Sequence, residues 1–276
     1  MNPNHRPIIQ MDACVSDQRE VAEESFVLSL EAPQIARDIQ PGQFIQIRCA
    51  HKDDPLLPRP FSIYRVRGKR FLDILYEVVG SGTKLLAEAK KGESLNIFGP
   101  LGNPFTYPDQ RANSFLVGGG VGLAPFYDLA EALIDPERGK QKKEDVVVLL
   151  GARTNQKIFC EKDFQELGIR FEVATDDGSY GFNGLVTELL KKELSARNGR
   201  SASAPAHLYA CGPKPMLHAV SQISEKLKLP CEVSIDAHMP CGYGICFGCA
   251  VRCNSSYRLA CTDGPIFKAE ELVWDR

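Results

Sequence analysis

The chain has 276 residues and a mass of 30.5 kDa, which is more than one typical domain requires. Hydrophobic residues make up 43% and charged residues 25%, a balance typical of folded globular proteins and not of disordered ones. The formal net charge is -2, and lysine and arginine form no basic patch for a nucleic acid or an anionic membrane. Neither a run of eighteen apolar residues nor a signal-peptide pattern is present, so we expect a cytoplasmic protein that binds no membrane.

The first hundred residues show short stretches of alternating apolar and polar side chains, separated by turn residues at 41–42, 67–68 and 99–103. This pattern predicts an antiparallel β-barrel with one short helix, in a first domain of residues 1–110. The predicted strands are 26–30, 44–48, 61–66, 71–79 and 94–98, and the predicted helix is 83–89.

Residues 111–235 show a different pattern, in which continuous apolar strands alternate with amphipathic stretches of helix length. This alternation predicts an α/β domain whose parallel sheet is covered by helices on both faces. A stretch of Ser, Gly and Ala at 197–205 predicts an exposed loop. The predicted strands are 114–117, 145–150, 171–175, 207–210 and 231–235, with helices beginning near residues 124, 163, 184 and 214.

The last segment, residues 236–276, is the third predicted domain of this α+β chain. It holds five of the ten cysteines and little periodic apolar pattern. Because cytosolic thiols are kept reduced, clustered cysteines there more often bind metal than form disulfides. We therefore expect this segment to fold around something other than a hydrophobic core.

Four cysteines of this segment have the ligand spacing of a 2Fe-2S cluster. Cys241, Cys246 and Cys249 follow the pattern C-x4-C-x2-C, and Cys261 comes later. Plant-type ferredoxins use this spacing to bring four thiolates to two irons. Structural zinc is the alternative, but zinc sites usually pair two short C-x2-C knuckles, which the first two cysteines are too far apart to form. We prefer Cys261 over Cys253 as fourth ligand, because Cys253 follows Cys249 closely and an intervening hairpin would return the chain to the cluster.

Two turns that each connect an apolar strand to a helix predict a dinucleotide site. Glycine there lets backbone N–H groups and the helix N-terminus approach a diphosphate closely. In an open parallel sheet both turns would lie at the carboxyl edge of the strands, where ligands bind. The alternatives are a tight structural turn for the first and a buried small residue for Cys211. The residues are Gly118, Gly119, Gly120 and Gly122 in the first turn and Cys211, Gly212 and Pro213 in the second.

In the predicted barrel, Arg59-Pro60-Phe61-Ser62 precedes Gly82-Thr83 at a helix start. Arg59 would hold a phosphate bidentately, Ser62 would bond a flavin ring atom, and the Gly-Thr amides would take a second phosphate oxygen. By chemistry alone, an arginine and a serine on a strand are more often plain surface residues.

Taken together, these residues resemble the ferredoxin reductase-like flavoproteins, and most closely the electron-transfer subunits of class 1B dihydroorotate dehydrogenases. The resemblance implies FAD bound by the first three motifs below, NAD by the next two, and a 2Fe-2S cluster held by Cys241, Cys246, Cys249 and Cys261. In chain order, the motifs are Arg59-Pro60-Phe61-Ser62, Leu75-Tyr76-Glu77, Gly82-Thr83, the glycine turn from Gly118, Cys211-Gly212-Pro213, and the cysteine segment ending in Cys261-Thr262-Asp263-Gly264-Pro265.

The resemblance also implies a partner. In this family a catalytic subunit with FMN oxidises dihydroorotate for pyrimidine synthesis, and electrons pass through that FMN, the cluster and FAD to NAD. We therefore expect a heterotetramer with two copies of each subunit, and no acid-base catalytic residue in this chain, because hydride and electron chemistry belong to the cofactors. Glu77 departs from the family pattern, in which an arginine is common beside the tyrosine, and Asp236 stands where a glutamate is usual.

Two other functions stay open. Small subunits of NAD(P)H-ferredoxin transhydrogenases and of sulfhydrogenases have a similar layout, although the transhydrogenases typically carry Asp where this chain has Cys241. A metal-stabilised binding module without turnover is the alternative from another class. The choice between NADH and NADPH, the oligomeric state and the cluster potential are also left open by the sequence.

Overall fold

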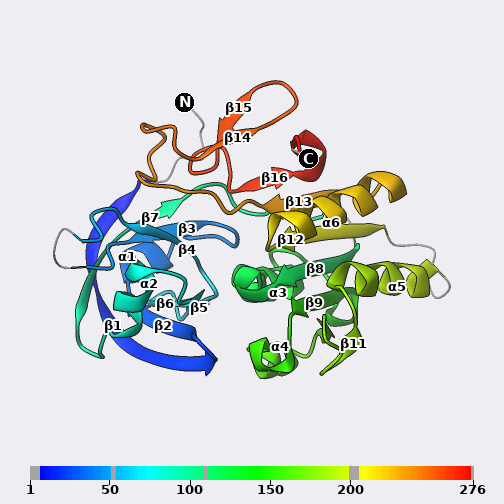
Figure 1. The fold of residues 1–276 in the computed structure, drawn as a ribbon, viewed down its shortest axis with the longest axis horizontal. Coiled ribbons are helices and arrows are strands. Elements are labelled where there is room, and N and C mark those ends of the chain that lie inside the picture. Colours follow the sequence, from blue (N-terminus) through cyan, green and yellow to red (C-terminus); the bar gives the residue numbers. More distant parts are fainter. Residues whose placement is uncertain (1–6, 51–53, 109–110, 199–204, 275–276) are drawn as a thin grey trace.

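The computed structural model describes residues 7–50, 54–108, 111–198 and 205–274. Two seven-stranded sheets form the two halves of the molecule, and a C-terminal segment with a small hairpin lies across both (Figure 1). None of the helices in these ranges is both long enough and apolar enough to cross a membrane. Most of the predicted loop at 197–205 lies outside the described residues.

The N-terminal sheet is antiparallel and curves into a half-barrel, with the strand order β4-β3-β7-β1-β2-β6-β5. Alternate residues point inward, so that Leu28 and Leu30 of β2 and Ile45 and Ile47 of β3 are fully buried in one core. The elements are β1 (Ile9–Ala22), β2 (Ser25–Glu31), α1 (Pro33–Ala36), β3 (Phe44–Ile47), β4 (Arg59–Ser62), β5 (Arg65–Arg67), β6 (Phe71–Glu77), α2 (Ser81–Ala87) and β7 (Ser94–Leu101).

Three predictions for this half were wrong. The sequence did not reveal β1, because alternate positions along it are exposed and polar and its apolar residues form no run. The predicted strand 61–66 is two strands, since the chain at Tyr64 turns to give its carbonyl oxygen to the amide of Asp128 in the other half. The predicted break at 99–103 begins too early, because β7 continues to Leu101.

The second sheet is parallel apart from its last strand, with the order β11-β10-β9-β8-β12-β13-β16. Its strands are β8 (Asn113–Gly119), β9 (Val146–Ala152), β10 (Arg170–Thr175), β11 (Phe182–Asn183), β12 (Ala206–Cys211) and β13 (Cys231–Ser234). The helices are α3 (Phe126–Ile134), α4 (Glu161–Leu167), α5 (Val186–Asn198) and α6 (Lys214–Leu227), with short 3-10 helices η1 (Gly120–Leu123), η2 (Lys143–Asp145) and η3 (Asn155–Lys157).

Helices cover both faces of this sheet, as predicted. Phe115 and Val117 of β8 pack in one core with side chains of α5 and α6, whereas Leu116 packs in another with α3 and α4. Both faces of the central strands β8 and β9 are therefore buried, which explains their continuous apolar runs in the sequence.

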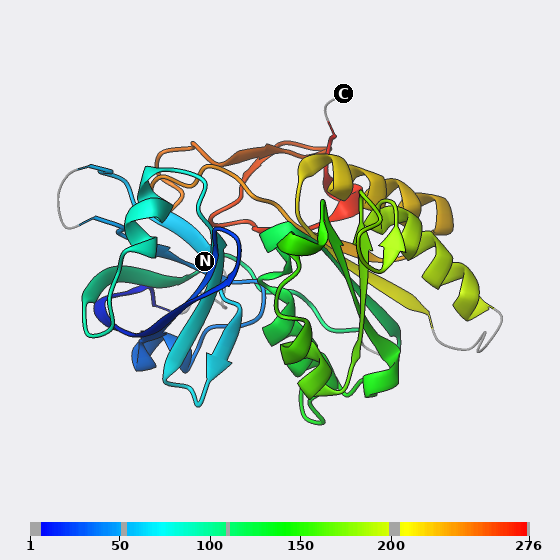
Figure 2. The ribbon, with the colours of Figure 1, turned by 60° about the horizontal axis from the view of Figure 1, so that its bottom comes forward.

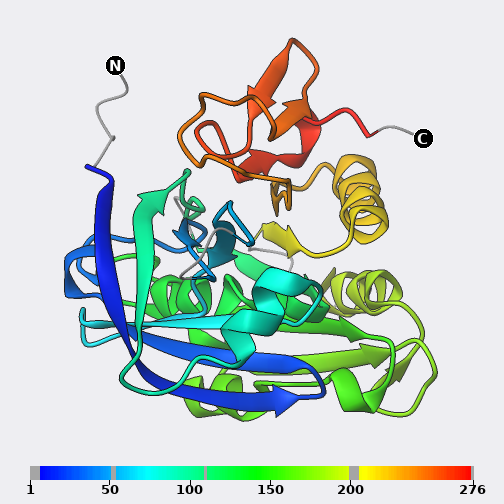
Figure 3. The ribbon, with the colours of Figure 1, turned by 60° about the vertical axis from the view of Figure 1, so that its left-hand side comes forward.

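The C-terminal segment extends the second sheet. It contains β14 (Ala250–Arg252), β15 (Tyr257–Leu259), β16 (Ile266–Lys268) and η4 (Ala269–Glu271). Strand β16 pairs antiparallel with β13, and Phe267 and Leu272 are buried in the same core as α6. The expectation that this segment has no hydrophobic core is therefore wrong for its final part. Its first part, residues 236–264, forms the loops and the β14–β15 hairpin at the top of Figure 3.

Candidate functional site

The four predicted cluster ligands lie in two pairs on the C-terminal segment. The Sγ atoms of Cys249 and Cys261 are 3.3 Å apart and both residues are buried. The thiols of Cys241 and Cys246 also contact each other. A 2Fe-2S cluster takes two thiolates at each of its two irons, so two pairs of cysteines fit it. Within the described ranges, no three or more His, Cys, Asp or Glu side chains lie close enough together to bind a single metal ion.

Backbone N–H groups point at the sulfurs of the more exposed pair. The amide of Tyr243 donates to Sγ of Cys241 at 3.4 Å, and the amide of Gly248 donates to Sγ of Cys246 at 3.5 Å. Desolvation raises the pKa of Cys241, but the surrounding N–H donors outweigh it and lower this pKa to about 7. The surroundings of Cys241 therefore favour its thiolate form, which is the form that binds iron.

The half-barrel holds this loop on both sides of the cysteines. The side-chain amide of Gln46 on β3 donates to the carbonyl oxygen of Met239, two residues before Cys241. The amide of Asn103, just after β7, donates to the carbonyl oxygen of Asp263 at 2.9 Å, two residues after Cys261. The sequence analysis missed both contacts, because a single Gln or Asn carries no local signal for a partner so distant in the chain.

The two predicted nucleotide turns lie side by side at the carboxyl edge of the parallel sheet. Strands β8 and β12 are neighbours, and Gly118 is paired with Cys211. A Cβ atom on Gly122 would overlap the carbonyl group of Cys211, and one on Gly119 would lie 2.8 Å from Cδ of Pro213. The close approach of the two turns therefore requires glycine at both positions.

The remaining residues of these turns also have identifiable roles. Gly120 has a φ of +55° and Gly212 a φ of +155°, which other residues rarely adopt. Burial raises the pKa of the Cys211 thiol to about 12, and this thiol contacts Ser234. A neutral thiol is a poor nucleophile, so Cys211 is suited to lining a pocket and not to covalent chemistry.

Arg59 and the Gly82-Thr83 turn meet on the outer surface of the half-barrel. A Cβ atom on Gly82 would lie 3.4 Å from Cγ of Arg59, whose guanidinium donates to the carbonyl oxygen of Leu57 at 2.8 Å. Leu57 is 47% exposed, so apolar surface is available beside the arginine. A charged group next to exposed apolar side chains suits a flavin nucleotide, which has a phosphate and a flat ring.

Thr83 has a structural contact in this turn. Its hydroxyl accepts the backbone N–H groups of Val79 at 2.9 Å and Gly80 at 3.1 Å, and thereby closes the start of α2. The structure thus gives Thr83 a capping role in addition to the predicted role of its amide.

Other predicted flavin residues are buried in two different cores, Phe61 and Tyr76 in the core of the half-barrel and Leu75 in the core shared with α3. Leu75 and Tyr76 are 3% exposed, and Phe61 is 8% exposed and meets the Tyr76 ring edge to face at 5.8 Å. Pro60 and Ser62 alternate with Phe61 along β4 and are partly exposed. The motif Arg59-Pro60-Phe61-Ser62 therefore presents both buried and accessible side chains.

Glu77, the unusual residue of the second motif, is paired with the other half of the molecule. Nζ of Lys157, in η3, lies 3.0 Å from Oε1 of Glu77 and 2.9 Å from the carbonyl oxygen of Glu23. The sequence analysis did not predict this contact. The carboxylate therefore has a protein partner at the position where an arginine is common.

Comparisons with known proteins identify an iron-sulfur domain, an NAD-binding domain and similar electron transfer subunits. The family model "Iron-sulfur cluster binding domain of dihydroorotate dehydrogenase B" matches residues 236–273, and the model "Oxidoreductase NAD-binding domain" matches residues 116–222. The chain is 38% identical over 260 residues to the dihydroorotate dehydrogenase B (NAD(+)) electron transfer subunit of Desulforamulus reducens, covering 92% of this chain and 95% of that protein. The subunit of the same name from Geobacillus kaustophilus is 39% identical over 265 residues, covering 94% and 96%.

Solved structures share the fold. The NADH-dependent reduced ferredoxin-NADP oxidoreductase, described for flavin-based electron bifurcation, superimposes with a TM-score of 0.82 at 30% identity and covers 95% of this chain and 90% of its own. A ferredoxin reductase of carbazole 1,9a-dioxygenase superimposes with a TM-score of 0.66 at 23% identity, covering 82% and 68%. The predicted arrangement of an antiparallel sheet, a parallel-sheet domain and an iron-sulfur segment is thereby confirmed.

Proposed function

Because the chain belongs to the family of electron transfer subunits of NAD-dependent dihydroorotate dehydrogenase B, we propose that it passes electrons between NAD and an FMN-containing catalytic subunit in pyrimidine (UMP) biosynthesis. The observation that carries the proposal is the paired arrangement of Cys241, Cys246, Cys249 and Cys261 beside the half-barrel. When bound, FAD exchanges hydride with the nicotinamide, and the 2Fe-2S cluster exchanges single electrons with the partner. The chain is thus an oxidoreductase subunit that depends on a catalytic partner, in a heterotetramer of two copies of each.

The residues of the chain bind and orient these groups. We assign a flavin phosphate to Arg59 and to the amides of Gly82 and Thr83, because the turn that carries these amides lies against the Arg59 side chain. Pro60 and Ser62 would lie against the flavin ring, while Phe61 and Tyr76 support that surface from the core of the half-barrel and Leu75 packs in the core shared with α3.

The NAD diphosphate is assigned to the amides of the turn formed by Gly118, Gly119, Gly120 and Gly122. The close approach of this turn to Cys211, Gly212 and Pro213 supports the assignment, since it brings the backbone of two glycine turns together at the carboxyl edge. Cys211 would line the nicotinamide pocket as a neutral thiol.

We assign residues 1–110 to a flavin domain, 111–235 to a nucleotide domain and 236–276 to a cluster domain, although β16 of the last one completes the second sheet. The cytoplasm is the proposed location, because the cysteines assigned to the cluster must stay reduced to bind iron.

The catalytic subunit would dock on the cysteine loop. Three large apolar side chains on it are exposed, namely Tyr243 at 44%, Ile245 at 74% and Phe247 at 68%. Clustered exposed apolar side chains commonly mark a protein interface. Docking here would place the partner beside Cys246, the one exposed residue among the four predicted ligands.

The test is anaerobic purification of the chain alone and together with the catalytic subunit, followed by flavin, iron and sulfide analysis and addition of NADH. We expect one FAD, two irons and two sulfides per chain, with the visible spectrum bleached by NADH. Zinc without flavin would refute the proposal and favour a metal-stabilised binding module.

A second candidate function is that of a small subunit of a ferredoxin-NADP transhydrogenase, favoured by the similarity to the NADH-dependent reduced ferredoxin-NADP oxidoreductase. Assays of the purified complex separate the two. Dihydroorotate-dependent reduction of NAD supports the first proposal, and ferredoxin-dependent reduction of NADP supports the second.

A further inference from the structure

Two contacts join the half-barrel to the segment that follows β9 in the α/β half, and we call them together the interdomain clamp. One joins Lys157 to Glu77, and the other joins Asp163 to Tyr64. The segment begins at the carboxyl edge of the parallel sheet, because β9 lies beside β8 and Gly151 is paired with Gly119 of the first nucleotide turn. The segment that carries Lys157 and Asp163 therefore starts close to the proposed NAD site.

The Lys157 contact reaches the strand that carries a predicted flavin motif. Glu77 ends β6 directly after Leu75 and Tyr76, and its carboxylate faces the lysine at 3.0 Å. Lys157 also donates to the carbonyl oxygen of Glu23, in the turn between β1 and β2, at 2.9 Å. One lysine thus bridges two places on the half-barrel.

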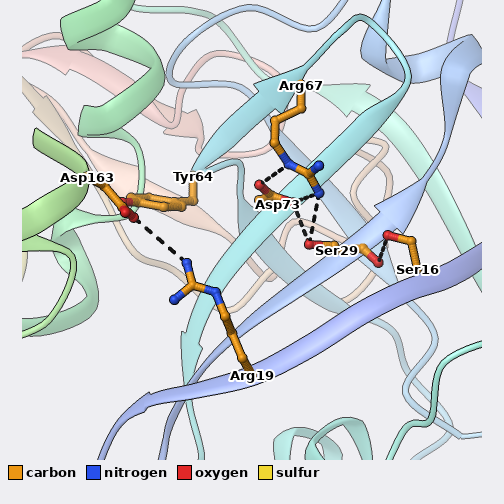
Figure 4. Close-up of polar contacts among 7 residues, drawn as sticks. All are labelled: Ser16, Arg19, Ser29, Tyr64, Arg67, Asp73 and Asp163. Carbon is orange, nitrogen blue, oxygen red and sulfur yellow. Dashed lines mark hydrogen bonds and ion pairs between the residues drawn. The ribbon is translucent and has the colours of Figure 1, made fainter. Parts of the chain in front are cut away.

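The Asp163 contact is the more buried of the two and is shown in Figure 4. The hydroxyl of Tyr64, a residue only 1% exposed, donates to Oδ2 of Asp163 at 2.6 Å. Arg19 of β1 approaches the same oxygen at 3.9 Å. Burial raises the pKa of Tyr64 well above its usual value, so the hydroxyl stays protonated and remains a donor.

Tyr64 also contacts the α/β half in two other ways. Its carbonyl oxygen accepts the backbone N–H of Asp128, and its ring lies 5.2 Å from the ring of Tyr127 on α3. Main chain, ring and hydroxyl of one residue therefore all contact the other domain. Such a contact resists both sliding and rotation of the α/β half on the half-barrel.

We propose that Tyr64, Glu77, Lys157 and Asp163 are positioning residues, which fix the NAD-binding half on the half-barrel so that the nicotinamide reaches the flavin. The inference rests on the proposed function. Hydride transfer between two bound groups is sensitive to their relative position, and a displacement of about 1 Å can slow a reaction on the order of a hundredfold. None of these four side chains needs to touch the hydride.

The experiment measures anaerobic reduction of the bound FAD by saturating NADH in the full chain, by stopped-flow absorbance. Tyr64→Phe combined with Lys157→Met is expected to lower the rate constant about tenfold or more. Reduction of the same variant by dithionite should proceed at the wild-type rate, since this small reductant needs no domain alignment. Exchange of the two charges, Glu77→Lys with Lys157→Glu, should recover part of the rate that either single change loses.

The matched control is Arg170→Met, which breaks an ion pair of 3.1 Å with Glu193 inside the α/β half and should leave the rate unchanged. A second readout does not depend on activity: hydrogen–deuterium exchange of the amides in 155–163 should be faster in Tyr64→Phe than in the wild type. Wild-type rates with NADH in the clamp variants, or equal slowing with dithionite, would overturn the inference. If NADH fails to reduce even the wild type, the proposed function fails, while the exchange experiment still tests the clamp.

Discussion

Cys253 shares a core with Cys249 and Cys261, but its own contacts are to other residues. Burial raises its pKa, and its charged neighbours are Arg258, Glu271 and Asp263. Its Sγ approaches the carbonyl oxygen of Val251 at 3.9 Å, and its backbone forms a bridge with Leu272. These contacts make Cys253 part of the core beneath the β14–β15 hairpin.

We therefore expect Cys253→Ala to keep the cluster and Cys261→Ala to lose it. The Cys253 change removes one buried sulfur, which should lower the free energy of unfolding by about 1 kcal/mol. Iron and sulfide content with visible absorbance gives the answer for both variants. Loss of iron from Cys253→Ala with iron retained in Cys261→Ala would show that Cys253, and not Cys261, is the fourth ligand.

Single residues differ in how much the sequence says about them. The four cysteines could be proposed as ligands because three of them lie within one loop and their spacing itself carries the chemistry. The partners of Gln46 and Glu77 could not, because each contact joins segments that only the folded chain brings together. Thr83 was assigned to a phosphate, and its hydroxyl in addition caps the turn.

Helix α3 carries a carboxylate that links it to the half-barrel. Asp128 is 5% exposed, and its carboxylate accepts the backbone N–H of Val66 on β5. Burial and the nearby Glu131 raise its pKa to about 7, and Arg138 opposes this shift only in part. The folded protein therefore holds a proton on Asp128 that the unfolded chain releases near pH 4.

This difference predicts that stability falls as pH rises. Because the folded pKa is raised, the contribution of Asp128 is fully present below pH 4 and is lost as pH rises through about 7. Between pH 5 and pH 8 the free energy of unfolding should fall by about 2–3 kcal/mol more in the wild type than in Asp128→Asn.

Urea-induced unfolding at the two pH values measures this difference. Asp135→Asn at the end of the same helix is the control, because the pKa of Asp135 is lowered and its charge does not change in this range. An equal pH dependence of the unfolding free energy in the wild type and in Asp128→Asn would show that the pKa of Asp128 is not raised in the folded protein.

Elements with strong patterns were predicted and those with mixed patterns were not. Strands β8 and β9 and helix α6 stood out because both faces of the strands and one face of the helix are buried. Strand β1 did not, since one of its faces is exposed over fourteen residues. The break at Tyr64 follows from contacts with α3 and α4, which no local pattern contains.

At the scale of the whole molecule, the half-barrel contacts both of the other parts. Gln46 on β3 and Asn103 just after β7 hold the cysteine loop, while Tyr64 just before β5 and Glu77 at the end of β6 contact the α/β half. Figure 2 shows the orange and red C-terminal segment extending over both sheets. The half-barrel therefore connects the parts of the chain to which we assign the flavin, the NAD and the cluster, which suits a chain that must keep them at fixed separations.

The exposed side of this arrangement is the cysteine loop, where we place the catalytic subunit. Phe247 adopts a φ of +58°, a conformation that is costly for a bulky residue and that persists only when the surroundings impose it. Its side chain is nevertheless 68% exposed. The positive φ and the exposed ring of Phe247 are both explained if this ring binds a partner protein.

We expect Ile245→Ser with Phe247→Asn to weaken binding of the catalytic subunit about tenfold or more, because exposed apolar anchors at the centre of an interface dominate its affinity. Asparagine tolerates positive φ, so the loop and its iron should be retained. Titration of the two subunits by calorimetry measures the affinity, while iron content and flavin reduction by NADH should match the wild type.

Leu227→Ser, at the 47% exposed end of α6, is the control and should bind normally. Unchanged affinity in the double variant would place the partner on another face, whereas weak binding with intact flavin reduction would separate docking from the NADH reaction.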